Sequence, residues 1–78
     1  MPSNPRSLLK KKTAKSLNHL DKTIVMLDEL YDVFQPQHPE YGDLLAAIIL
    51  GLITSRGFIL DFWGKAWGEQ PDDYTRWL

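Results

Sequence analysis

The chain has 78 residues, of which 44% are hydrophobic and 24% charged, and its formal net charge is −1. A chain of this length forms one domain that buries only about 60% of its unfolded surface, so its core gains from an oligomer. The absence of cysteine excludes disulfides and thiolate metal sites and fits a reducing compartment, so we expect a cytoplasmic protein.

The first expected helix covers residues 5–35. Asn4 or Ser7 can cap its start, and Pro5 suits the first helical position. Pro36 ends it, because proline cannot donate a backbone N–H and restrains the residue before it. Apolar residues at intervals of three and four predict a packed face, with a second stripe beside it. The packed face comprises Leu17, Leu20, Ile24, Leu27, Tyr31 and Phe34, and the second stripe comprises Met26, Leu30 and Val33.

The second expected helix covers residues 39–67, with Pro39 at its first position and Gly68 followed by Pro71 as its stop. Two helices of equal length with a short, proline-rich connection predict an antiparallel hairpin. The second helix is apolar nearly all round. Its polar line comprises Asp43, Ala47, Thr54, Asp61 and Lys65.

A helix with so narrow a polar face must be covered on most sides, and the first helix can cover only one of them. We therefore expect an all-α fold, in which residues 1–78 form a single hairpin domain that dimerises into a four-helix bundle. Three small residues four apart, Ala47, Gly51 and Ser55, would let helices approach closely in that dimer.

Arg56 interrupts the apolar run of the second helix. An unpaired buried charge costs several kcal/mol, so one interpretation pairs Arg56 with a carboxylate of the first helix or lets it reach the bundle edge. Asp28, Glu29 and Asp32 are the candidate partners. The alternative interpretation places Arg56 on a partner-facing surface, because arginine and tryptophan are enriched in interface hot spots.

The aromatic tail, residues 68–78, has two interpretations. In either of them Pro71 can open a short third helix. The tail folds back and caps the end of the hairpin core, or it docks a partner. In the second case the anchors continue a set that begins on the second helix. The candidate partner-binding residues are Arg56, Trp63, Trp67, Tyr74, Arg76 and Trp77.

The start of the first helix is basic. Residues 1–22 carry six Lys or Arg and one Asp, whereas the rest of the chain carries three Lys or Arg and nine acids. No apolar run follows the N-terminal charges, so we expect no secretory signal. A solvated helix end, an acidic protein partner and nucleic-acid phosphates all fit this patch, but no nucleic-acid-binding motif accompanies it. The basic patch comprises Arg6, Lys10, Lys11, Lys12 and Lys15.

The run of ten apolar residues at 44–53 is too short to span a bilayer, and Arg56 would fall inside a longer window, so we expect no membrane span. His19 and His38 lie on different elements, and no spacing indicates a nucleophile, a metal or a cofactor. The sequence therefore predicts no enzyme. It predicts a small interaction module, an adaptor or inhibitor of a larger protein. A nucleic-acid-associated protein and a structural subunit of an assembly are the alternatives.

Overall fold

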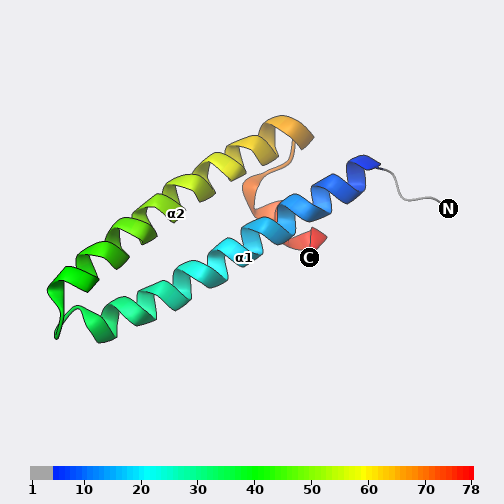
Figure 1. Ribbon diagram of the computed structural model, residues 1–78. Helices are drawn as coiled ribbons and strands as arrows, with labels where there is room; N and C mark the ends of the chain where they lie inside the picture. Colours follow the sequence, from blue (N-terminus) through cyan, green and yellow to red (C-terminus); the bar gives the residue numbers. More distant parts are fainter. Residues whose placement is uncertain (1–4) are drawn as a thin grey trace.

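The computed structural model describes the backbone of residues 5–78 and the side chains of residues 6–70 and 74–78. Within these residues every regular element is helical, as expected, and the two long helices form an antiparallel hairpin (Figure 1). The elements in chain order are α1 (Pro5–Phe34), α2 (Pro39–Trp67) and a short 3-10 helix, η1 (Pro71–Trp77).

The connection between the helices is short and holds the two helix ends close together. The His38 N–H donates to the carbonyl of Phe34 over 2.7 Å, which closes the end of α1. Gly42 in the first turns of α2 is buried against Gln35, and a Cβ added there would lie 2.7 Å from the Gln35 Cγ. A glycine at position 42 therefore permits the close approach of the two helix ends. The expected cap Asn4 lies outside the described residues.

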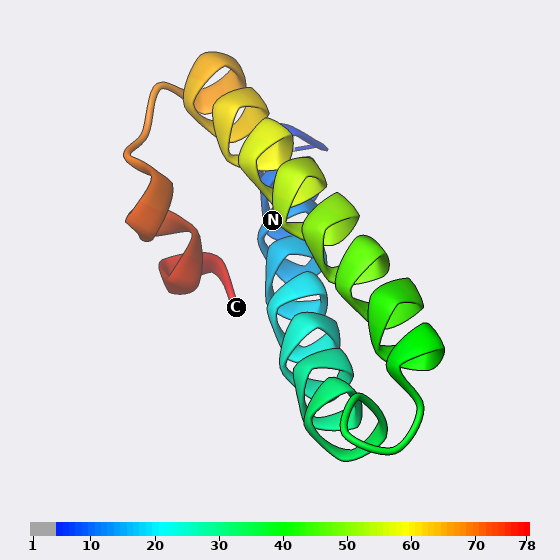
Figure 2. The same cartoon turned by 90° about the vertical axis from the view of Figure 1, so that its left-hand side faces the viewer.

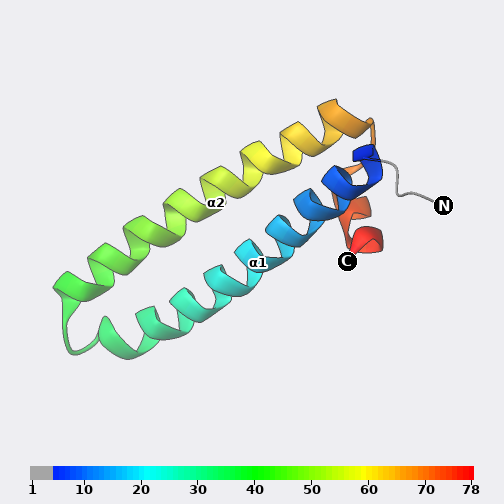
Figure 3. The ribbon, with the colours of Figure 1, turned by 45° about the vertical axis from the view of Figure 1, so that its right-hand side comes forward.

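Gly68 ends α2, as the sequence predicts. Its φ of 65° is in the left-handed region, which glycine enters without a Cβ clash, and its N–H donates to the Gly64 carbonyl over 2.8 Å. This reversal sends the tail back along the hairpin. In Figures 2 and 3 η1 lies beside the open end of the hairpin, next to α1.

The face of α1 that was expected to pack does so except at the turn end. Leu17 is fully buried, Leu20, Ile24, Leu27 and Tyr31 are half-buried, and Phe34 is exposed. The second stripe behaves differently, since all three of its residues are exposed: Met26, Leu30 and Val33. The polar line of α2 is also exposed. One helix thus covers one face of its neighbour and no more.

The hairpin is a single layer of helices, measuring 55 × 22 × 16 Å. Its radius of gyration is 15.8 Å, whereas a compact domain of this length has about 11.5 Å. The buried apolar core of the described residues sits at the open end, where α1, α2 and η1 meet. It comprises Ala14, Leu17, Trp63 and Tyr74.

Candidate functional site

Asp21 of α1 joins the three elements through one carboxylate. Its Oδ1 accepts a hydrogen bond from the Nε of Arg56 over 2.5 Å, and Oδ2 lies 3.5 Å from the Arg56 Nη2. The Tyr74 hydroxyl donates to the same Oδ2 over 2.7 Å. The carboxylate therefore holds α2 and the tail to α1 at one point.

The expected partners of Arg56 were wrong, although the expected ion pair with α1 is present. In an antiparallel hairpin, residues at equal distances from the turn face one another. Arg56 lies about 17 residues into α2, whereas Asp28 lies about six residues before the end of α1, so their levels differ by roughly 16 Å at 1.5 Å per residue. Asp21 lies about 13 residues before the end of α1. The remaining difference in level is about four residues, or roughly 6 Å, which an arginine side chain can bridge.

The pKa shifts in this network follow from its geometry. Burial alone would raise the pKa of Asp21, but the hydrogen bonds from Arg56 and Tyr74, with the charge of Arg56, lower it below its usual value. The hydrogen bond to Asp21 raises the pKa of Arg56. The same acceptor, together with burial, raises the pKa of the Tyr74 hydroxyl. At neutral pH the network is thus a carboxylate held by a guanidinium and a neutral phenol.

Lys10 makes a second attachment of the tail. It is only 9% exposed, it forms an ion pair with Glu69, and its Nζ lies 4.3 Å from the centre of the Trp77 ring and 5.6 Å from that of Trp63. A cation at these distances over aromatic faces is attracted by their negative π surfaces. The ammonium is thus held by one carboxylate and two indole rings.

The expected basic patch is therefore divided. Lys10 faces inward, and Nη2 of Arg6 donates to the Ala66 carbonyl over 2.9 Å at the open end. Lys11, Lys12 and Lys15 are exposed.

The tail folds back on the core, which is the first of its two interpretations. Trp63 is fully buried and Tyr74 is 8% exposed, whereas Trp67 and Trp77 are half-buried and Arg76 is exposed. The Nε1 of Trp63 has no hydrogen-bond partner among the described residues. In this conformation only part of the candidate partner-binding set reaches solvent, and a role of these residues in binding stays a prediction.

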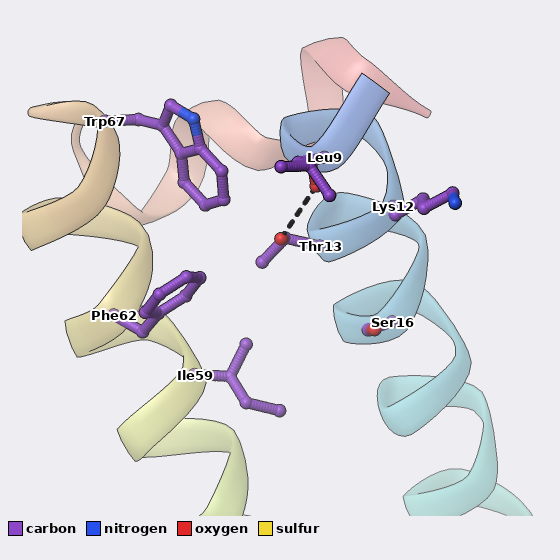
Figure 4. A pocket seen from close by; sticks show the side chains of 7 residues that line it. All are labelled: Leu9, Lys12, Thr13, Ser16, Ile59, Phe62 and Trp67. Carbon is purple, nitrogen blue, oxygen red and sulfur yellow. Dashed lines mark hydrogen bonds between the residues drawn. The ribbon is translucent and has the colours of Figure 1, made fainter. Parts of the chain in front are cut away.

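An apolar groove of about 380 Å³ opens at the same end of the hairpin (Figure 4). In the view of Figure 4 the ribbon of the tail lies behind the two helices, so the groove and η1 are on opposite faces. Phe62 and Trp67 meet edge to face in its wall, 5.2 Å between ring centres, and the Thr13 hydroxyl is satisfied by the Leu9 carbonyl. The lining residues are Leu9, Lys12, Thr13, Ser16, Ile59, Phe62 and Trp67.

The sequence analysis names Lys12 and Trp67 as candidate functional residues but none of the other residues that line this groove. The apolar residues of α2 occupy almost its whole circumference, so their spacing does not show which of them the tail leaves uncovered. The candidate dimer stripe lies away from α1: Ala47, Gly51 and Ser55 are exposed, and a Cβ at Gly51 would meet nothing within 4 Å.

By length and apolar composition, α2 is the one helix of the described residues that could cross a membrane, with a mean hydropathy of 1.8 in its most apolar window. This criterion is weak for a single helix, and the absence of a membrane span stays a prediction. Among the described residues no group of three or more His, Asp or Glu is placed to hold a metal ion. No family model, no curated protein and no solved structure matches this chain.

Proposed function

We propose that this protein is a protein–protein interaction module that self-associates into a four-helix bundle and acts as an adaptor or inhibitor of a larger protein. The observation that carries the proposal is the large apolar surface that the hairpin leaves uncovered. Phe58 is 70% exposed, and Leu44 and Leu50 are each 65% exposed. Covering a side chain of this size contributes about 1.5–3 kcal/mol, and monomeric proteins rarely leave so many uncovered.

A protein partner fits this surface better than a bilayer does. A bilayer would have to accommodate the Arg56–Asp21 pair and also the outward carboxylates of α1, since α1 lies along most of the length of α2. Charged groups inside the hydrocarbon region are expensive unless they face a protein interior. A second helical layer covers the apolar residues and leaves these charges at its edges.

A protein partner also fits better than nucleic acid. Lys11, Lys12 and Lys15 lie on an exposed surface, but Lys10 is held by Glu69 and two indole rings inside the fold. Three lysines on one helix supply few phosphate contacts. If the nucleic-acid alternative held, binding to arbitrary duplex DNA would weaken steeply with salt, which a titration measures directly.

Sedimentation equilibrium over the micromolar range tests the proposal. We expect a dimer, and we expect Gly51→Leu to weaken it far more than Ala47→Ser, because only the leucine fills space that a neighbouring helix would need. The hairpin itself should tolerate the leucine, since nothing lies within 4 Å of a Cβ at this position. A stable, compact monomer across the whole range would refute self-association.

A further inference from the structure

We infer that the second copy docks on the face of the hairpin opposite η1 and runs in the opposite direction, so that the turn end of each copy lies against the open end of the other. This inference rests on the proposed self-association and adds the interface and its orientation. The occupant is a second copy of this chain, and the contact is isologous, with the same surface contributed by both copies.

The face is located by the groove at the open end and is followed along each helix in steps of seven residues. Positions seven apart differ by only about 20° around a helix, so such a series stays on one side of it. The series starts in the groove at the open end and continues to the turn, where Tyr41 meets Phe34 edge to face at 6.1 Å. We call this the heptad face. It comprises Leu9, Ser16, Thr23 and Leu30 on α1, and Tyr41, Ile48, Ser55 and Phe62 on α2.

The side chains of the heptad face are shaped for a helical partner. Large apolar residues at its two ends remain about half exposed: Leu9, Leu30, Tyr41 and Phe62. Smaller residues, Ser16, Thr23 and Ser55, occupy most of its middle beside Ile48. Small residues let two backbones approach closely near a two-fold axis, while the large ones fill the space between helices that diverge toward the ends.

The charges decide the orientation. Residues 23–55, which form the turn half, contain five acids and no Lys or Arg. The rest of the chain contains nine Lys or Arg and five acids, and in it Lys11, Lys12 and Lys15 are exposed on α1, whereas Lys65 of α2 pairs with Asp61. A parallel dimer would align the acidic turn half of one copy with that of the other, and the basic open ends likewise. The antiparallel arrangement aligns halves of opposite charge, which favours that orientation.

The area of the chain agrees with one such interface. Its accessible surface is 5722 Å², whereas a folded monomer of 9.0 kDa has about 4,900 Å². The difference is of the same order as the roughly 800 Å² that each partner buries in an interface of standard size.

A dimer through the heptad face leaves the opposite face for a larger protein. Tyr74 covers the open half of that face, but its turn half still exposes Val25, Leu50 and Ile53. At about 100° per residue Val25 lies about 40° from Asp21 on α1, and Ile53 and Leu50 lie about 20° and about 80° from Leu60 on α2. All three therefore share the side of the hairpin on which η1 docks. An adaptor needs two such surfaces, one for itself and one for its partner.

Orientation is tested by distances between spin labels. The chain has no cysteine, so Gln37→Cys places one label at the exposed turn of each copy. In an antiparallel dimer the two turns are separated by about one helix length, roughly 45 Å for 30 residues. In a parallel dimer they lie within about two helix diameters, roughly 20 Å. A long distance is expected, and a short one overturns the orientation while leaving self-association intact.

The face is tested by a matched pair of charge insertions. Ile48→Glu places a carboxylate on the heptad face, whereas Leu50→Glu places one two residues away on the other flank, where the wild-type side chain is more exposed. We expect Ile48→Glu to raise the dimer dissociation constant at least tenfold and Leu50→Glu to change it less than threefold. The reverse order overturns the assignment of the face. A wild-type chain that is monomeric refutes the proposed self-association itself, which is a distinguishable result.

Discussion

Arg56 and Asp21 form an ion pair across the hairpin, with the arginine Nε 2.5 Å from Oδ1 of the carboxylate. Arg56 interrupts the apolar run of α2, and this pairing explains how the charge is accommodated there. Both side chains remain about one third exposed, at 33% and 35%, so water shares in solvating them. The pair therefore resembles a partly screened contact more than a fully buried one, and its contribution to stability is correspondingly smaller.

The first prediction concerns the removal of this pair. Arg56→Ala should lower the free energy of unfolding by about 1–2 kcal/mol, because hydrogen bonds to charged groups contribute about 1.5–3 kcal/mol and solvent screening reduces this. Arg56→Met should cost less, since its stem still packs against α1. Urea denaturation at a fixed protein concentration measures both.

Lys65 provides the matched control. It pairs with Asp61 one helical turn away over 3.0 Å, with both side chains largely exposed. Lys65→Met should therefore change stability by less than about 0.5 kcal/mol. An equal loss for Arg56→Ala and Lys65→Met would mean that the Asp21 contact contributes nothing specific.

The second prediction is a dependence on pH. The folded state lowers the pKa of Asp21 below its ordinary value of 3.8, so the unfolded chain binds the proton more tightly. Its contribution to stability is therefore present above that value and is lost as the pH falls through the folded-state pKa. Asp21→Asn should be less stable than the wild type at pH 6, and the difference should shrink on acidification. A difference that stays constant down to pH 2 would contradict the assigned shift.

The third prediction concerns the attachment of the tail by Lys10. Lys10→Met removes the ion pair with Glu69 and the contacts with the faces of Trp63 and Trp77, so η1 should open more often. Hydrogen exchange of the amides in residues 74–78 should become faster. Lys11→Met changes an exposed lysine one position along and should leave exchange there unchanged. Equal exchange in both variants would show that other contacts hold the tail.

The fourth prediction concerns the turn. Gly42→Ala should destabilise the hairpin by about 1–2 kcal/mol, because the new Cβ would come within 2.7–3.0 Å of Gln35 and push the helix ends apart. Gly57→Ala is the control, since nothing lies within 4 Å of its added Cβ. Alanine is the better helix former by about 1 kcal/mol, so Gly57→Ala should be neutral or stabilising. Thermal melts should therefore show a lower Tm for Gly42→Ala and an unchanged or higher Tm for Gly57→Ala.

The two helices and their ends are determined locally, and for that reason they can be read from the sequence. Apolar spacing of three and four residues from Leu17 onward predicts the packed face of α1. Pro36 and Pro39 bound the turn, and Gly68 ends α2 by entering the left-handed region. Each of these signals acts within about one helical turn of the residue that carries it. The register of one helix against the other depends on contacts between the two helices, which lie beyond that range.

The tertiary structure alone decided which groups meet. The partner of Arg56 is Asp21 because the antiparallel register aligns those two levels, and Lys10 turned from a surface charge into a buried one because the tail returns beside α1. The groove of Leu9 and Phe62 exists because the tail covers only one face of the open end. All three outcomes depend on contacts between residues 35 or more positions apart. Packing geometry, and not local spacing, determines which side chains meet in these contacts.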